Sequence, residues 1–135
     1  MYTVGVTGSF SAIHALVGDF GEETIPHSHP YRLEWDFEIG DLDENGFSLD
    51  ISRLIAARDR LFSELNGKNL NKDPFFRDIQ TSLENLCLYM ANELLEALAP
   101  GPSELKRISR MNVRVWETED AWAGYQKVFT QEYAK

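Results

Sequence analysis

The chain has 135 residues, of which 43% are hydrophobic and 12% aromatic, and its formal net charge is −9. This size fits a single domain over residues 1–135, and the acidic balance argues against nucleic acid and anionic membranes as partners, because both are polyanions. A single cysteine, Cys87, excludes a disulfide within the chain. Without a secretory signal or an apolar run long enough for a membrane span, the expected compartment is the cytoplasm.

The N-terminal third of the sequence predicts two strands. Residues 2–15 are rich in Thr, Val, Phe and Ile and predict the first strand. Two glycines, acidic residues and a proline at 17–26 predict a loop. Residues 27–39 alternate between apolar and charged side chains, which is typical of a half-buried strand, and turn-forming residues at 40–46 end it.

The middle of the sequence predicts two helices. Apolar residues recur at near-helical spacing over 51–65, with Asp50 or Ser52 as the N-cap. A loop at 66–78, which contains Gly, Asn and Pro, precedes a second predicted helix over 82–98. The first residue of that second segment is a serine, which suits a helix cap.

The C-terminal third predicts two further strands. The run Pro100, Gly101 and Pro102 predicts the end of the second helix. Residues 110–116 and 122–129 predict strands joined by a short connection. The order β-β-α-α-β-β favours an α+β fold, in which helices cover one face of an antiparallel sheet.

The sequence contains three histidines, His14, His27 and His29, all of which lie near the predicted first hairpin. Residues i and i+2 of a strand point to the same face, so His27 and His29 can reach one ion together. The end of the first strand is the natural antiparallel neighbour of the start of the second. Three imidazoles converging there would form an open zinc site with one position left for water or substrate.

An H-x-H pair alone is a weak signal, because most such pairs are ordinary surface residues. Six short elements strengthen it: FSAIH at 10–14, HSHPY at 27–31, LDENGFSLD at 42–50, LNGKNLN at 65–71, TSLEN at 81–85 and VWET at 115–118. FSAIH resembles the FSA-x-H element, and HSHPY the HGHNY element, of the 6-pyruvoyltetrahydropterin synthase and 6-carboxytetrahydropterin synthase family. The other four resemble further elements of that family, in the same order.

The resemblance implies the tunnelling fold (T-fold), a four-stranded antiparallel sheet with two helices on one face. This agrees with the element order taken from the patterns above. In this family, subunits join edge to edge into a barrel and the active sites lie between subunits. The resemblance therefore implies a homo-oligomer, a hexamer, in which no sheet edge stays exposed.

The resemblance also implies Zn²⁺ as cofactor, a pterin as small-molecule substrate, and particular residues for each. The zinc ligands correspond to His14, His27 and His29. The pterin-anchoring glutamate corresponds to Glu117, whose carboxylate could accept two N–H bonds from the pyrimidine edge. Outside the family context Glu117 would be a solvated residue at a strand end. Further candidates for hydrogen bonds to the pterin are Thr81, Thr118 and Ser82, the last of which equally suits a helix cap.

Two departures from the family pattern bear on catalysis. The family's proton-transfer cysteine corresponds to Glu23, with Glu22 beside it, although both also suit a solvated acidic loop. A subgroup that resembles this arrangement cleaves dihydroneopterin triphosphate to 6-hydroxymethyldihydropterin, a folate precursor. The family's Asp-His pair corresponds to Asn66 and Gly67, and neither residue can perform acid–base chemistry.

Three functions remain open from the sequence. The first is a zinc-dependent lyase acting on dihydroneopterin triphosphate or a related pterin, by side-chain cleavage or by triphosphate elimination, in folate or queuosine biosynthesis. The second is a zinc- and pterin-binding homologue without catalysis, such as a sensor, carrier or assembly subunit. The third is an enzyme acting on a different pterin-like or purine-like substrate.

Overall fold

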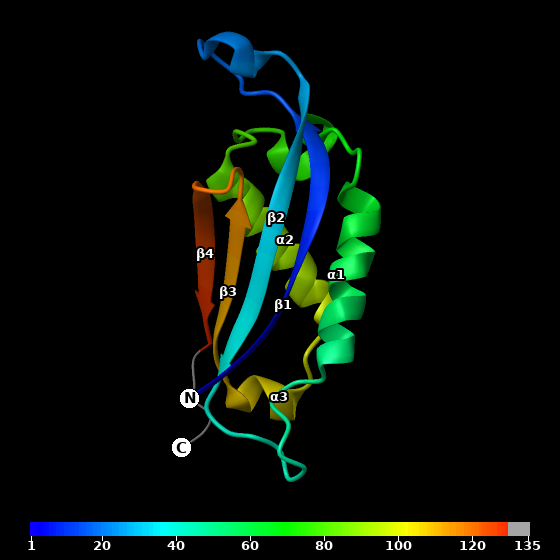
Figure 1. Cartoon of the computed structure of the whole chain (residues 1–135), viewed down its shortest axis with the longest axis vertical. Helices are drawn as coiled ribbons and strands as arrows, with labels where there is room; N and C mark the ends of the chain where they lie inside the picture. Colours follow the sequence, from blue (N-terminus) through cyan, green and yellow to red (C-terminus); the bar gives the residue numbers. More distant parts are fainter. Residues whose placement is uncertain (130–135) are drawn as a thin grey trace.

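The computed structural model describes residues 1–129 and contains one antiparallel sheet with helices on one face (Figure 1). The sheet order follows the chain, β1-β2-β3-β4. The strands are β1 (Tyr2–His14), β2 (His27–Ile39), β3 (Ile108–Trp116) and β4 (Trp122–Val128). The helices are α1 (Ile51–Leu65), α2 (Leu83–Leu98) and α3 (Pro102–Arg107), with short 3-10 turns η1 (Gly21–Thr24), η2 (Leu70–Lys72) and η3 (Pro74–Phe76).

The predicted order of strands and helices is confirmed, with α3 as an addition that the sequence patterns did not predict. The second helix ends as expected, where Ala99 adopts a left-handed φ of 46°. Pro102 then opens α3 instead of only ending α2, because proline is suited to the first helical position. Glu104 completes this short helix by accepting a hydrogen bond from the Gly101 N–H.

Both main helices begin at side-chain caps. Asp50 is the N-cap of α1, and its carboxylate accepts the Ser52 N–H at 2.9 Å. Ser82 is the N-cap of α2, and its hydroxyl accepts the Asn85 N–H at 3.2 Å. Of the two caps considered for α1, Asp50 is therefore the one used.

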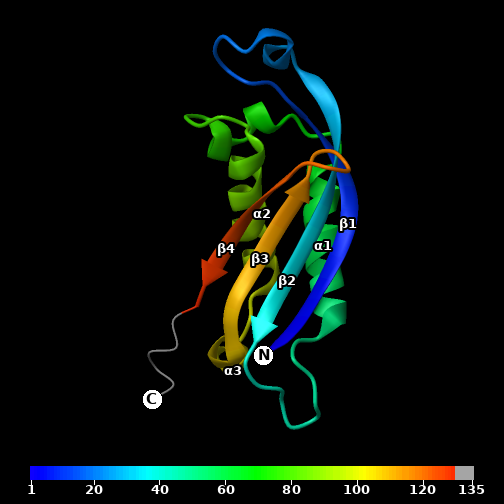
Figure 2. The same ribbon diagram turned by 60° about the vertical axis from the view of Figure 1, so that its left-hand side comes forward.

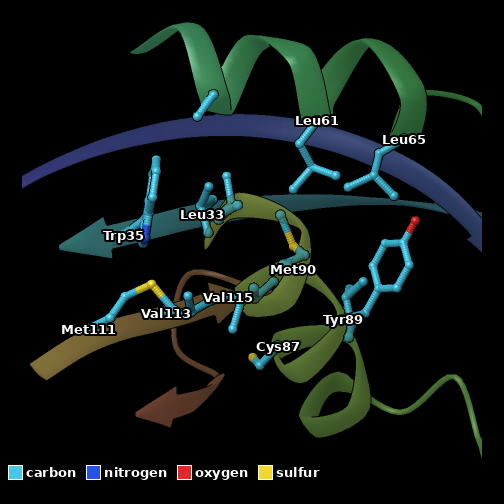
Figure 3. Packing of buried hydrophobic residues seen from close by; sticks show 14 of the residues in the cluster. Leu33, Trp35, Leu61, Leu65, Cys87, Tyr89, Met90, Met111, Val113 and Val115 are labelled. Atoms are coloured by element: carbon cyan, nitrogen blue, oxygen red, sulfur yellow. The ribbon is translucent and has the colours of Figure 1, made fainter. Parts of the chain in front are cut away.

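The core lies between the sheet and the helices α1 and α2 (Figure 3). Alternation along β2 sends every second side chain towards the helices, where burial removes it from water. Leu61 and Leu65 of α1 and Met90 of α2 pack against this face. Cys87 is also buried here, and burial raises the pKa of its thiol to about 11. The fully buried strand residues include Leu33, Trp35, Phe37, Met111 and Val115.

A close approach between α1 and β1 depends on Gly8. A Cβ at this position would lie 2.7 Å from a ring carbon of Phe62, so only glycine lets the helix pack at this distance. The opposite face of the sheet is polar, and the described helices leave it open (Figure 2). There Asn112 donates to Asp36 at 2.8 Å and to Glu38 at 2.9 Å, and Trp116 donates to Glu34 at 2.6 Å.

The first hairpin extends beyond the rest of the sheet. β1 pairs with β2 along its whole length, from Tyr2 opposite Ile39 to His14 opposite His27. β3 pairs with β2 only from Arg32 onwards, so residues 27–31 have a strand partner on one side only. In Figure 1 this end of the hairpin and the loop that closes it rise above β3 and β4. Within residues 1–129, no helix combines the length and apolarity that crossing a bilayer requires.

Candidate metal centre and adjoining pocket

The three histidine rings meet at the extended end of the first hairpin. His14 and His27 are direct cross-strand neighbours, and His29 pairs with Ala12 two residues further along. The ring centroids of His14 and His27 lie 4.5 Å apart, and the His29 centroid lies 6.5 Å from His14 and 6.4 Å from His27. The hairpin therefore brings the three rings to one end of the sheet, but the ligand atoms that lie within 4.8 Å of one another are those of His14, Glu23 and His27, and His29 lies outside that group. Binding of one ion by all three histidines stays a prediction.

Each imidazole is oriented by a main-chain carbonyl. The Nδ1 atom lies 3.0 Å from the Thr81 carbonyl oxygen in His14, 2.9 Å from that of Ile25 in His27, and 2.6 Å from that of Pro30 in His29. A carbonyl can only accept, so Nδ1 must carry the proton in all three rings. The Nε2 atom of each neutral ring then carries a free lone pair, which is the state that binds a metal.

His14 provides the strongest indication of a ligand. Its Nε2 is buried and has no hydrogen-bond partner within residues 1–129. Burial lowers the pKa of His14, although its bond to Thr81 opposes the shift, so the ring favours the neutral form. A buried acceptor without a partner costs roughly 1–3 kcal/mol, and a bound cation would remove that cost. The donor set therefore fits Zn²⁺, which favours imidazole nitrogen.

Glu23 joins this group from the loop that closes the hairpin. Its carboxylate Oε2 lies 3.7 Å from His27 Nε2, and donor atoms of His14, Glu23 and His27 lie within 4.8 Å of one another. Glu22 precedes it in η1, and both glutamates are exposed. Of the two acids predicted as catalytic, Glu23 is the one that the fold brings to the histidines.

A pocket of about 470 Å³ is lined mostly by residues of β2 and of the β3–β4 turn. Glu117 connects the two regions, since its Oε1 lies 3.9 Å from His29 Nε2 and its side chain lines the pocket. The backbone N–H of Glu117 donates to the Ala121 carbonyl at 2.9 Å, which fixes the residue at the β3–β4 turn. The lining residues are Ser9, Pro30, Tyr31, Arg32, Glu34, Trp116, Glu117, Thr118 and Glu119.

The family of 6-pyruvoyl tetrahydropterin synthases matches this chain over residues 3–128. The chain belongs to this family. It is 32% identical over 114 residues to the dihydroneopterin monophosphate aldolase of Pyrococcus furiosus, covering 84% of this chain and 92% of that protein.

Solved structures of this family share the fold. The 6-pyruvoyl tetrahydropterin synthase of Caenorhabditis elegans has a TM-score of 0.77 and 25% identity, covering 93% of this chain and 95% of that one. The synthase of Plasmodium falciparum has a TM-score of 0.75 and 20% identity, covering 94% of this chain and 98% of that one. The T-fold predicted for the chain is thus confirmed, and its relatives are pterin-processing enzymes.

Among the predicted pterin contacts of this synthase-family chain, Glu117 and Thr118 line the pocket, whereas Thr81 and Ser82 do not. Thr81 is buried and holds His14 through its carbonyl oxygen and, at 3.3 Å, through its hydroxyl. Ser82 caps α2. Their placement gives both residues a structural role, and contact with a pterin stays a prediction for all four.

The positions of the family's Asp-His pair anchor β1 in this chain. The Asn66 side-chain oxygen accepts the Ser11 N–H at 2.9 Å. Gly67 has a φ of +79°, which favours glycine, and its N–H donates to the Ser11 carbonyl at 3.1 Å. Proton transfer in this synthase-family site would therefore have to come from other groups, of which Glu23 lies nearest to the histidines.

Tyr31 ends the HSHPY element, but the sequence patterns gave it no role in the site. It lies two positions beyond His29 on the same strand face, and its ring is 4.8 Å from the His29 ring and 5.2 Å from that of Phe10. Burial, together with the charges of Glu117 and Glu23, raises its pKa above the ordinary value for a phenol. It lines the pocket as a neutral phenol that can donate a hydrogen bond. Continuing the i, i+2 spacing of the histidines by one step identifies it.

Proposed function

We propose that the chain is a zinc-dependent lyase that cleaves the side chain of a dihydroneopterin phosphate to 6-hydroxymethyldihydropterin and a phosphorylated glycolaldehyde. The observation that carries the proposal is the placement of the Glu23 carboxylate 3.7 Å from His27 Nε2, within one group of metal-ligating atoms. The resemblance to an aldolase that acts on dihydroneopterin monophosphate supports the same reaction class.

In this proposal, three histidines hold the cofactor and two glutamates handle the substrate. Zinc bound by His14, His27 and His29 would supply Lewis-acid polarisation of the side-chain hydroxyls. Glu117 orients the pterin by accepting N–H bonds from its pyrimidine edge. Glu23 removes the proton from the C2′ hydroxyl.

The proposed cleavage needs no co-reactant. As the C2′ oxygen becomes an aldehyde, the C1′–C2′ bond breaks and its electron pair moves into the conjugated C6=N5 unit of the ring. Return of the proton to C1′ gives the hydroxymethyl product, so all substrate atoms appear in the two products. One carboxylate can serve both proton transfers, which suits a site in which Asn66 and Gly67 occupy the Asp-His positions.

The charge near the pocket favours the monophosphate over the triphosphate as substrate. The pocket lining contains the carboxylates of Glu34, Glu117 and Glu119 and a single cationic side chain, Arg32. A triphosphate carries more negative charge into these surroundings and would be repelled more strongly. We therefore infer a preference for the monophosphate, which agrees with the substrate in the name of the Pyrococcus furiosus relative.

Chromatography of reaction products tests this proposal. The zinc-loaded protein is incubated separately with dihydroneopterin monophosphate and triphosphate, and 6-hydroxymethyldihydropterin is expected, faster from the monophosphate. Glu23→Gln should lower turnover roughly 10²–10⁴-fold, because the amide cannot accept the proton. Glu22→Gln is the matched control and should stay within about twofold of the unmodified chain. Release of inorganic triphosphate would instead indicate elimination.

A second function, a zinc- and pterin-binding protein without catalysis, is favoured by one observation. Asn66 and Gly67 are engaged with the backbone of Ser11 and supply no titratable group. Full zinc loading and tight pterin binding without conversion of either phosphate would favour this second function over the lyase.

A further inference from the structure

Two side-chain amides replace a strand partner for the backbone that follows His14. After β1 ends, the Asn71 amide accepts the Ala15 N–H at 2.8 Å and donates to the Ala15 carbonyl at 2.9 Å. The Gln80 amide does the same at Val17, accepting its N–H at 2.8 Å and donating to its carbonyl at 2.5 Å. A primary amide presents a donor and an acceptor side by side, so each forms a two-bond contact like that of a neighbouring strand.

Leu16, which lies between these two contacts, binds the loop that carries Glu23, the proposed base. The Leu16 N–H donates to the Glu23 carbonyl oxygen at 2.7 Å. Asn71 and Gln80 thus bind the backbone of Ala15 and Val17, and Leu16 between them binds Glu23.

Both amide-bearing residues are themselves held by a further hydrogen bond. Asn71 belongs to η2, and its own N–H is bound by the Asn69 side chain at 3.1 Å. Gln80 precedes α2, and its carbonyl accepts the Asn85 side-chain N–H at 3.0 Å. The loop carrying Glu23 is otherwise exposed, with apolar side chains such as Val17 and Ile25 facing solvent at 71% and 63% exposure. Its position therefore depends on the hydrogen bonds and not on burial.

We propose that Gln80 and Asn71 are positioning residues for Glu23, fixing its carboxylate relative to the histidines through Ala15, Leu16 and Val17. This inference rests on the proposed function for its effect on turnover. Misplacing a reacting group by about 1 Å can cost roughly 100-fold in rate, so loosening the loop should lower kcat while the histidines and Glu117 stay in place.

The first test compares three variants in the zinc-loaded protein. Gln80→Ala should lower kcat roughly 10–100-fold, with zinc stoichiometry and pterin Kd within about twofold of the unmodified chain. Gln126→Ala is the matched control, an exposed glutamine on β4, and should leave all three quantities unchanged. Gln80→Glu, whose carboxylate cannot donate to the Val17 carbonyl, should resemble Gln80→Ala at neutral pH.

A double-mutant cycle then asks whether Gln80 acts through Glu23. In the Glu23→Gln background, Gln80→Ala should change the residual turnover less than about twofold, because the group that it positions is gone. An equal loss in both backgrounds would overturn the inference, as would loss of zinc or pterin binding in Gln80→Ala. If Glu23→Gln keeps full turnover, Glu23 is not the base and that part of the proposed function is wrong. This outcome is distinct from a failure of Gln80 to hold the loop.

Amide hydrogen exchange gives a readout that needs no activity. The Leu16 amide donates to Glu23, so Gln80→Ala and Asn71→Asp should each speed its exchange at least about tenfold, and Gln126→Ala should not. Asn71→Asp keeps the side-chain volume, so it still tests the inference if an alanine variant fails to fold. Unchanged Leu16 exchange in both variants would overturn the inference, whatever the substrate proves to be.

Discussion

The helix-facing side chains of β2 divide into two regions that share one strand and one register but differ in what surrounds them. Leu33 and Trp35 lie beneath α1 and α2 (Figure 3), and both they and Phe37 are almost completely buried. His27 and His29 lie beyond the end of β3, where the strand has a partner on one side only. The first region gains stability from burial, and the second keeps polar atoms available for a ligand. The same alternation of side chains along β2 thus forms the core in one part of the strand and presents the histidines in the other.

The largest expected effect is at the imidazole end. His14→Ala should weaken zinc affinity by more than about 100-fold, since even changes in residues that only support metal ligands cost 10–100-fold. Metal analysis after dialysis against a chelator measures it. Full zinc occupancy in this variant would refute the ligand assignment. The free energy of unfolding without metal should change less than in the core variant below.

A substitution in the buried part of β2 should lower stability and leave zinc binding unchanged. Leu33→Ala should lower the free energy of unfolding by about 2–5 kcal/mol, because a fully buried side chain leaves a cavity. Below its melting temperature, the folded variant should still bind zinc with unchanged stoichiometry. Urea denaturation and metal analysis of the same sample check both statements. Loss of zinc from the folded variant would show that the two regions are not independent.

An intermediate effect is expected beside His29. Glu117→Gln should weaken pterin binding by about 1.5–3 kcal/mol, or roughly 10–150-fold in Kd, if the carboxylate makes the charged contact. Glu119→Gln, in the same pocket lining, is the matched control and should change Kd less than about threefold. Fluorescence titration with a pterin measures both, and equal Kd values for the two variants would count against the anchor role.

The smallest effect concerns Asp73, which lies between η2 and η3. Burial opposes its ionisation, but hydrogen bonds from Lys68 and the Phe75 N–H outweigh burial and hold the pKa of Asp73 below its ordinary value. The folded state then binds fewer protons than the unfolded state, so this contribution is complete above about pH 4 and is lost as the pH falls further. Asp73→Asn should therefore be less stable than the parent at neutral pH, with a difference that shrinks below pH 4. Urea midpoints across pH measure it, and a constant difference would contradict the assignment.

Much of the fold was predictable because its signals are local. Alternation over 27–39 and helical spacing over 51–65 gave the bounds of β2 and α1 as the structure has them. The missed element, α3, begins at Pro102, which the sequence pattern indicated only as a stop. A proline at a helix start and one after a helix end look alike in sequence.

The site was predictable where strand periodicity and family motifs reached it. His27 and His29 follow from i, i+2 spacing, and His14 from hairpin pairing. The supporting contacts were not predictable, because Thr81, Asn71 and Gln80 act on residues 67, 56 and 63 positions away through backbone atoms. Nothing in the local sequence marks such partners. The same holds for choosing Glu23 over Glu22, which depended on how the loop folds back.

The carbonyl partners of the three imidazoles have an evolutionary consequence. Thr81, Ile25 and Pro30 each orient a histidine through a main-chain oxygen, and every amino acid supplies that atom. Substitution at these three positions can therefore change side chains without deleting the acceptor, as long as the backbone path is kept. The orientation of the rings therefore depends on the backbone path at these three positions, with the Thr81 hydroxyl as the one side chain among them that also contacts a ring.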